Sequence, residues 1–318
     1  MKIQIPDQLK SAVPQTLFGR VLAATPVIMA VVATLLAGLA SSEMTKAQYQ
    51  RALAAQQQSK AGDQWSFFQA KRMRGAFQSN TAELMQSLTP VRPVGPAALT
   101  AWAQGQPGLS QRLESPQGQQ AMKYLEHGQV PPIPAGVALD PKIQAALRGV
   151  ETMAPDTEME KLMAPVSNQM LDQALVAAGD RVEAFDRETS PVNAVIDHIY
   201  SLLRQSSGAG GGSASGPSLV RDFAVARMRY TAVRYEAEAR LNQAIANIYE
   251  LQVRKSNFEA QRHLERSQRF FFGMLAAQLG VIVATLAMAA RQRNLLWSLA
   301  AFAGLLAVAF AIYVYLYV

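Results

Sequence analysis

Hydrophobic residues are concentrated in three long uncharged runs of the chain, separated by polar segments. The runs are residues 21–40, 270–290 and 295–318. At a helical rise of about 1.5 Å per residue, about 20 residues cross the hydrocarbon core of a bilayer. We therefore predict three transmembrane helices, the second and third being joined by a hairpin loop at residues 291–294.

The first run has a second interpretation, which is a cleavable signal peptide. Lys2 and Lys10 precede it, and Gly38-Leu39-Ala40 resembles a small-residue cleavage site. Its length exceeds the roughly 7–15 residues of a usual signal-peptide core. We favour a retained anchor, preceded by an N-terminal tail at residues 1–20.

Small residues within the last two runs indicate close packing between membrane helices. Ala276, Gly280 and Ala284 recur at every fourth position, and Gly304 follows Ala300 at the same spacing. Small residues at this spacing let helix backbones approach closely in a membrane. They specify packing without identifying the partner helix.

Two polar segments have the composition of long helices. Residues 41–88 contain no proline and are rich in alanine, glutamine, lysine and arginine, and residues 219–272 contain neither proline nor glycine. Apolar or small residues recur at steps of three and four between Leu219 and Leu251, which is a heptad seam. As helices, 43–88 and 219–269 would be about 69 and 77 Å long. We predict an antiparallel coiled-coil stalk of segments 41–88 and 218–269, packed through the following residues: Trp65, Phe68, Phe223, Tyr230, Leu241 and Ile248.

The segment between the two stalk helices, residues 89–217, has a different character. Nine of the sixteen prolines lie in residues 89–141, which predicts an extended, loop-like chain. Short helices are expected near 141–150, 156–188 and 191–205, with Asp140, Asp156 and Ser190 as N-caps. Residues 206–218 have the composition of a flexible Gly/Ser linker. The predicted fold class is thus an all-α membrane protein with three transmembrane helices, a stalk and an irregular helical tip.

Charge follows the same division of the chain. The net charge is +7 overall, with residues 41–88 and 218–269 basic and residues 89–217 acidic. A basic stalk beside a bilayer favours contact with anionic lipid. Nucleic acid is the weaker interpretation, because the aromatic residues near the basic ones already belong to the packing seam and no nucleic-acid-binding motif is present.

Residues 59–72 (SKAGDQWSFFQAKR) combine aromatic and basic side chains. Trp65 and Phe68 are three residues apart and share a helix face, whereas Phe67 points elsewhere. One interpretation is a docking surface for another subunit, because aromatic residues and arginine are enriched at binding hot spots. The other is packing inside the stalk beside a solvated charged face. The candidate docking surface consists of Phe67, Lys71, Arg72 and Arg74.

This segment, a DQW run followed by two aromatic residues and QAK after a first membrane span, resembles an uncharacterised bacterial membrane family, domain-of-unknown-function family 4337. The end of the chain is also similar, where a helix enters a membrane span and Arg291-x-Arg293 precedes a last span. The resemblance covers roughly residues 35–80 and 255–318. It implies a membrane-anchored helical protein and brings no activity and no functional residue.

The residues that catalysis or metal binding requires are sparse. The chain has no cysteine and three histidines, which lie far apart. Glu259 and His263 are four residues apart and could share a metal ion, but metal sites in bundles draw ligands from several helices. Neighbouring carboxylates such as Glu158 and Glu160 are interpreted as solvated surface groups. We expect no enzyme activity, no cofactor and no small-molecule substrate.

The sequence therefore favours a membrane-anchored structural or accessory subunit that acts through helix–helix contacts, with itself or with other membrane proteins. The alternative is a channel-forming or channel-regulating subunit, although ion pathways are usually marked by charged residues inside the spans and these spans have none. Short basic segments set membrane orientation, and both the N-terminal tail and the hairpin loop are basic. We predict a multi-pass protein of the bacterial inner membrane with the stalk and tip outside the cytoplasm. Basic residues near the membrane on the stalk side argue for the opposite orientation.

Overall fold

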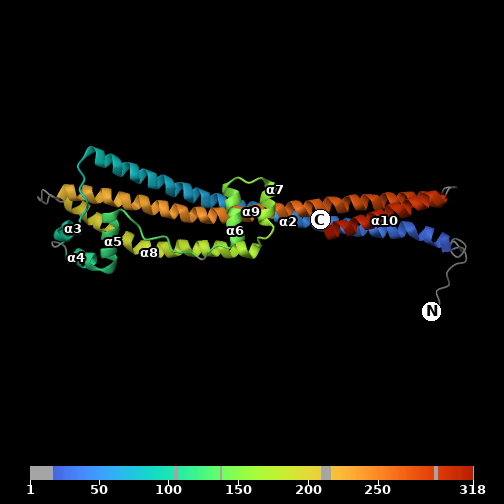
Figure 1. The fold of residues 1–318 in the computed structure, drawn as a ribbon, viewed down its shortest axis with the longest axis horizontal. Helices are drawn as coiled ribbons and strands as arrows, with labels where there is room; N and C mark the ends of the chain where they lie inside the picture. Colours follow the sequence, from blue (N-terminus) through green and yellow to red (C-terminus); the bar gives the residue numbers. More distant parts are fainter. Residues whose placement is uncertain (1–16, 104–106, 137, 209–215, 290–292, 318) are drawn as a thin grey trace. The chain divides into compact units, whose positions relative to one another are not determined.

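A computed structural model describes residues 17–103, 107–136, 138–208, 216–289 and 293–317 (Figure 1). Every regular element within these ranges is an α-helix, which confirms the predicted all-α class. Three of the described helices, α2 (Leu17–Leu88), α9 (Gly216–Ala289) and α10 (Arg293–Tyr317), are long and apolar enough to cross a membrane.

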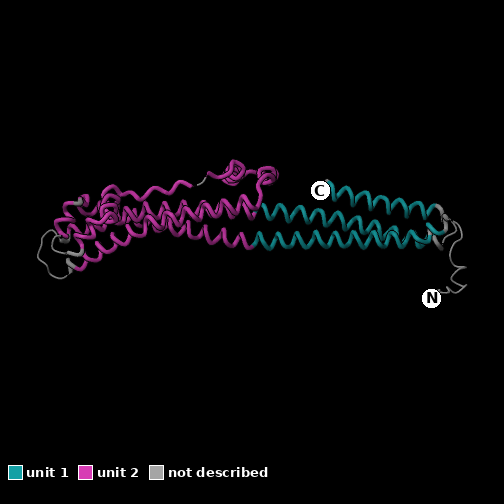
Figure 2. The backbone as a smooth tube through the Cα atoms, turned by 90° about the horizontal axis from the view of Figure 1, so that it is seen from below, with its two compact units in different colours: residues 1–55, 254–318 teal, residues 56–253 magenta. Residues whose placement is uncertain are grey.

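The chain forms two compact units, shown in different colours in Figure 2. Unit 1 comprises residues 1–55 and 254–318, and unit 2 comprises residues 56–253. Helices α2 and α9 each contribute residues to both units. Residues 41–55, expected to open the stalk, thus belong to the same unit as the three apolar runs.

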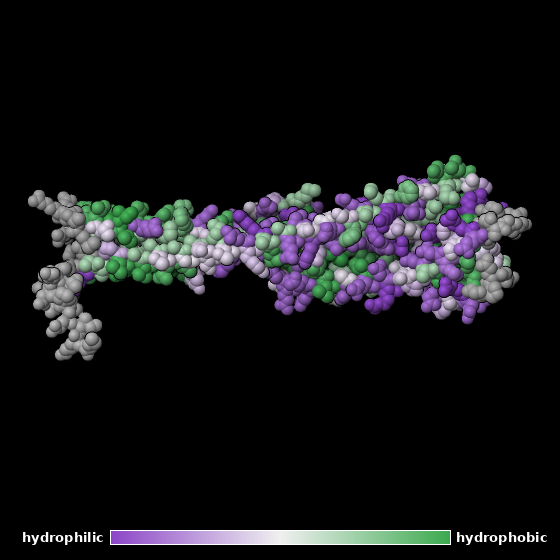
Figure 3. Space-filling view, turned by 180° about the vertical axis from the view of Figure 1, so that it is seen from behind, coloured by the Kyte–Doolittle hydropathy of each residue, from purple (hydrophilic) through white to green (hydrophobic). Residues whose placement is uncertain are grey.

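Unit 1 packs α2, the end of α9 and α10 around a core of small and apolar residues. Figure 3 shows hydrophobic side chains gathered over the surface of this unit. Trp297 Nε1 donates to Thr25 Oγ1 at 3.0 Å, and Ser267 Oγ donates to the carbonyl of Ala40 at 2.7 Å. These bonds join α2 to the start of α10 near residue 25 and to α9 near residue 40.

Met29 of α2 lies against both of the other helices of unit 1. Its side chain is buried, and a Cβ added at either Gly280 of α9 or Gly304 of α10 would overlap it. The predicted packing residue Ala284 is fully buried, and Ala276 packs partly buried against the same core. The glycines therefore make room for a methionine of α2.

Buried positions in α2 recur at every seventh residue along most of the helix. The small buried residues at this spacing are Ala33, Ala40, Ala47, Ala54, Ala61, Gly75 and Ala82. The side chains three residues after each of these positions are buried or partly buried, and most of those from Gln50 to Gln78 are glutamines. This face of α2 thus packs through alanine and amide side chains rather than through large hydrophobic ones.

Unit 2 contains the rest of α2 and α9 together with α3 (Pro96–Ala103), α4 (Pro107–Glu114), α5 (Pro116–His127), α6 (Pro141–Glu151), α7 (Asp156–Met163) and α8 (Asn168–Gly208). One core cluster joins α3, α4, α5, α8 and α9, and its fully buried members include Leu99, Leu109, Ile199 and Phe223. Helix α8 lies along α9 through residues from Asp172, which bonds Gln252, to Tyr200.

The expectation of an extended chain over residues 89–141 is wrong where α3, α4 and α5 form. Each of these helices begins with a proline, at Pro96, Pro107 and Pro116. Proline is tolerated at the first helical position because its missing N–H would have no partner there anyway. Ser115 Oγ accepts from the Gly118 N–H at 3.1 Å and caps α5. The prolines therefore start helices here instead of preventing them.

The helix predicted over 156–188 is divided, and the one predicted over 191–205 has no separate start. Helix α7 ends at Met163, and α8 then continues through Pro191. An interior proline costs about 3 kcal/mol. Buried residues on both sides of it, including Phe185 and Ile196, keep the helix on its core.

Of the three predicted N-caps, one is confirmed. Asp140 accepts from the Lys142 N–H at 2.8 Å and caps α6. Asp156 lies inside the first turn of α7, whose cap is Pro155, and Ser190 lies inside α8. Residues 209–215 of the predicted linker and residues 291–292 of the predicted hairpin loop lie outside the described residues.

Candidate docking groove

A groove in unit 2 brings together part of the predicted docking surface. It has a volume of about 320 Å³ and is lined by residues of α2, α8 and α9. Phe185 of α8 and Leu241 of α9, both buried, belong to one apolar cluster beneath it. Phe67 and Lys71 line its α2 side. Charged side chains from all three helices, Lys71, Asp186 and Glu238, line it as well, so the groove combines an apolar floor with an exposed aromatic ring and charged groups.

Phe67 is the exposed aromatic residue of the groove. Its exposed fraction is 55%, although it sits among residues that line a concave surface. A solvent-exposed phenylalanine beside an apolar floor has the character of a binding anchor. Phe67 differs in this from Trp65 and Phe68, which are both partly buried.

Trp65 connects α2 to α9, and Phe68 packs against it. The Trp65 indole Nε1 donates to Glu250 Oε1 at 2.8 Å, and the rings of Trp65 and Phe68 meet edge to face with centroids 5.3 Å apart. A charge-assisted hydrogen bond is stronger than a neutral one. Trp65 thus fixes α2 beside α9 at this level, and Phe68, on the same helix face, supports its ring.

Lys71 is already paired within the chain. Its ammonium group donates to the carboxylate of Glu238, which also lies 3.5 Å from Arg234 Nε. The same ammonium lies 5.3 Å from the centre of the Tyr235 ring. Because Glu238 is held between two cations, Lys71 has a structural role whether or not a partner binds.

Gln64 adds an unfilled hydrogen-bonding group to the groove. Its Oε1 atom is buried and has no hydrogen-bond partner among the described residues. Buried polar atoms in folded proteins nearly always have a partner, so each exception needs an explanation. An incoming donor in the groove would satisfy this acceptor.

Arg72 and Arg74 are both exposed on α2. The Arg72 guanidinium lies 5.5 Å from the centre of the Phe68 ring. Neither residue lines the groove, which Phe67 and Lys71 do. The structure therefore brings two of the four candidate docking residues into one concave surface and leaves two beside it.

The predicted seam of α9 lies against α8. Phe223 stacks on Tyr200 of α8 with ring centroids 6.4 Å apart, and the Tyr230 hydroxyl donates to Asn193 Oδ1 at 2.8 Å. Leu241 belongs to the cluster that includes Phe185 of α8. Ile248 is buried. Residues assigned to a two-helix stalk thus contact a third helix, while Val233 of the same seam is 41% exposed.

Glu259 and His263 do not share a partner. Glu259 pairs with Lys255 at 3.3 Å, whereas His263 Nδ1 donates to Glu43 Oε2 of α2 at 2.6 Å. Glu43 also accepts from Lys46 Nζ at 2.6 Å. No group of three or more potential metal ligands occurs in the part of the chain that the structure describes.

Sequence reasoning missed the part that α8 plays in the groove and the unpartnered Gln64. The buried face of α2 could have been recognised in the sequence, because alanines and glutamines recur there at every seventh residue. Nothing comparable in the sequence links Phe185 to Leu241, because their contact joins segments more than fifty residues apart.

Residues 18–115 match the model of an uncharacterised family, a domain of unknown function (DUF4337). The match confirms the resemblance over residues 35–80 and contains nearly all of α2, including the Trp65 segment. Residues 255–318, where a second similarity was expected, lie outside it. No curated protein and no solved structure matches the chain.

Proposed function

We propose that this protein is a membrane-anchored structural or accessory subunit that acts through helix–helix contacts, in a homo-oligomer or a larger membrane complex. The observation that carries the proposal is Phe67, which is 55% exposed at the edge of a groove lined by α2, α8 and α9. A helix from another subunit would bury Phe67 against the Phe185 and Leu241 floor and could supply a donor to Gln64. Buried aromatic anchors of this kind dominate binding energy at interfaces.

We further propose that segments 41–88 and 218–269 form an antiparallel coiled-coil stalk. Contacts in unit 2 support it, because Trp65 meets Glu250, Lys71 meets Glu238 and Gly75 approaches Ala232. Residue numbers rise along α2 as they fall along α9. The seven-residue repeat of small residues in α2 is typical of helices that supercoil left-handedly.

The proposed location is the bacterial inner membrane, with the N-terminal tail and the hairpin in the cytoplasm. The bond between Thr25 and Trp297 supports placing the start of the first span and the start of the last on one side. The stalk and tip are then outside the cytoplasm, where basic stalk residues would contact anionic lipid headgroups. A periplasm-only reporter enzyme inserted within residues 206–218 should be active, and activity of a cytoplasm-only reporter there would reverse this orientation.

The docking proposal is tested by comparing Phe67→Ala with Phe77→Ala in the full chain. Phe77 is 69% exposed on the same helix and does not line the groove. Native mass spectrometry after extraction in a gentle detergent would report the assembly. We expect Phe67→Ala to weaken assembly by about 2 kcal/mol, the size of a hot-spot residue, and Phe77→Ala to leave it unchanged. Equal effects of the two variants would refute docking at this groove.

The stalk proposal is tested by a disulfide between α2 and α9. A Cβ placed at Gly75 would lie 3.5 Å from Tyr235 Cβ, and bridged cysteines have Cβ atoms about 3.5–4.5 Å apart. We expect Gly75→Cys with Tyr235→Cys to crosslink within one chain, and Phe77→Cys with Tyr235→Cys not to crosslink. Bridges found only between chains would show an intermolecular pairing instead.

A further inference from the structure

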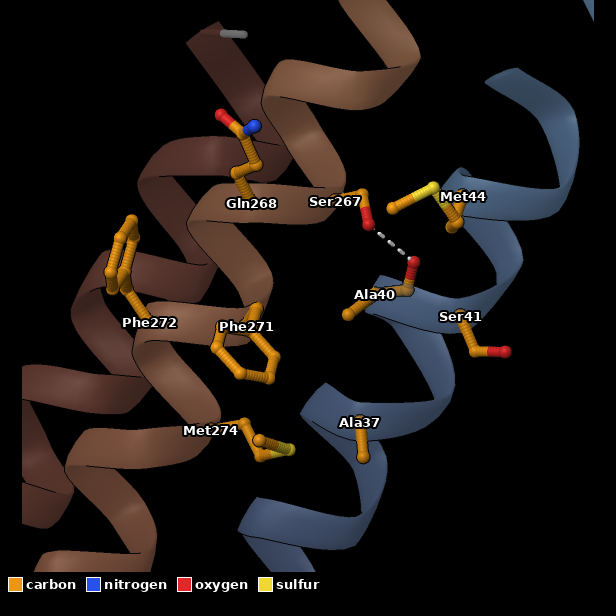
Figure 4. A pocket seen from close by; sticks show the side chains of 9 residues that line it. All are labelled: Ala37, Ala40, Ser41, Met44, Ser267, Gln268, Phe271, Phe272 and Met274. Atoms are coloured by element: carbon orange, nitrogen blue, oxygen red, sulfur yellow. Dashed lines mark hydrogen bonds between the residues drawn. The ribbon is translucent and has the colours of Figure 1, made fainter. Parts of the chain in front are cut away.

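We infer that a groove in unit 1 binds the acyl chain and ester region of a glycerophospholipid, without selecting the charge of the headgroup. The groove has a volume of about 610 Å³ and lies between α2 and α9 (Figure 4). This volume is within the range of about 300–1,000 Å³ for small-molecule sites. The inference rests on the proposed membrane location.

The groove exists because small residues on α2 face large ones on α9. Ala37 and Ala40 line the α2 wall, while Phe271 and Met274 point toward them from α9. The bond from Ser267 to the Ala40 carbonyl holds the two helices together at this level. The hollow is therefore a consequence of close helix contact beside small side chains.

Its polarity changes along the two helices. The groove spans the end of the uncharged run 21–40 and the start of the run 270–290. Ser41 and Gln268 line its outer end, and Ala37 and Met274 line its inner end. The six helical steps from Gln268 to Met274 cover about 9 Å. A phospholipid has the same order of groups over such a distance, with polar esters above and hydrocarbon below.

A hydrocarbon chain is sufficient to fill the inner part of the groove. The buried side-chain polar atoms that lack a hydrogen bond among the described residues belong to residues that do not line the groove, so none of these atoms requires a partner from the occupant. The Ser267 hydroxyl is already engaged by Ala40. The exposed apolar wall would gain free energy from contact with another apolar surface.

The described lining of the groove is uncharged. No charged side chain lines the groove within the described residues, and the neighbouring Lys46 is paired with Glu43. The Ser41 hydroxyl and the Gln268 amide are exposed at the polar end of the groove, and Figure 4 shows both directed away from the space between α2 and α9. They would have to turn toward it to donate to the ester oxygens that all glycerophospholipids share. The site therefore differs from the basic stalk surface, where anionic headgroups are favoured.

The test uses the full chain in vesicles that contain a phospholipid with a diazirine in its acyl chain. Two probes are used, one with a choline and one with a glycerol headgroup, and labelled residues are mapped by mass spectrometry. We expect both probes to label residues 37–44 and 267–274 more strongly than Leu286 and Leu305, which are exposed on α9 and α10. Labelling that is equal at all of these positions would mean general lipid contact and would overturn the inference.

A matched pair of variants adds a second measurement. Ala37→Trp should fill the groove and reduce its labelling about tenfold, because displacing roughly two buried methylenes changes affinity by about that factor. Leu35→Trp is the control, since Leu35 is 64% exposed on α2 and does not line the groove. An unchanged groove signal in Ala37→Trp, or disulfide dimers of Ser41→Cys that exclude the probe, would refute a lipid occupant. Absence of labelling at Leu286 and Leu305 as well would refute the membrane location itself.

Discussion

The contact of Met29 with two glycines predicts strongly coupled mutations in unit 1. A Cβ at Gly280 would overlap the Met29 methyl group, and a Cβ at Gly304 would overlap its sulfur. These atoms are the flexible end of the Met29 side chain, so this end can shift away from one added methyl group. Two added methyls close both sides at once. The perturbation is therefore Gly280→Ala and Gly304→Ala, separately and together.

The expected magnitudes follow from two opposing effects. Replacing glycine by alanine inside a helix gains about 1 kcal/mol, whereas overpacking a core costs about 1–3 kcal/mol. Each single variant should thus lose about 0–2 kcal/mol of unfolding free energy. The double variant should lose at least about 1 kcal/mol more than the sum, because contacting residues that share one space do not act additively.

Met29→Ala gives the decisive comparison. In the natural chain it removes a buried side chain and should cost about 2–5 kcal/mol. In the double alanine background it should restore stability, because it removes the overlap and the new methyls occupy part of the vacated space. Gly38→Ala is the control, since no atom lies within 4 Å of a Cβ there.

The assay is the unfolding of the purified full chain in detergent, followed by helix content as denaturing detergent is added. The unfolding free energy is measured for Gly280→Ala, Gly304→Ala, the double variant and the control Gly38→Ala, each with and without Met29→Ala. The differences give the coupling energy between Met29 and the two glycine positions. If Met29→Ala costs the same in both backgrounds, the three helices do not meet at Met29 and the packing of unit 1 described above is incorrect.

Two further predictions concern pH. Burial alone raises the pKa of Glu43, but hydrogen bonds from Lys46 and His263 and their charges outweigh it and hold the pKa below its usual 4.5. The stability that the Glu43 carboxylate adds is present above about pH 4.5 and is lost as pH falls through the lowered pKa. Glu43→Gln should therefore flatten the acid side of a plot of melting temperature against pH. An unchanged slope would exclude Glu43 as the cause. Burial raises the pKa of Tyr230 to about 12, and its hydroxyl bonds Asn193. Stability should therefore fall between about pH 10 and 12 in the natural chain and not in Tyr230→Phe, as measured by circular dichroism; identical profiles would contradict the buried phenol.

The sequence was sufficient to predict the features that depend on composition over long windows. Uncharged runs of twenty residues or more predict the apolar ends of α2 and α9 and all of α10. The absence of proline from residues 41–88 predicts that α2 continues beyond its apolar run, and it does so to Leu88. Such properties are additive along one helix and need no knowledge of what the helix contacts.

Features that depend on contacts between distant segments were not predictable. The seam of α9 was expected against α2, but an amphipathic face does not identify its partner, and residues such as Tyr230 pack on α8. Proline suggested loops in residues 89–141, whereas its position at a helix start depends on a neighbour such as the Ser115 cap. In each case the local sequence pattern is present, but a tertiary contact determines which structure it forms.

The alanine-rich face of α2 explains why polar contacts matter in the candidate site. Burying an alanine removes little apolar surface, and a seven-residue repeat of near-identical small residues fits several registers almost equally well. Specific pairs must then select one register, as buried polar residues do in coiled coils. The bond from Trp65 to Glu250 and the pair of Lys71 with Glu238 are placed to do this. Since both pairs lie next to Phe67, the contacts that align the two helices also determine where the groove opens.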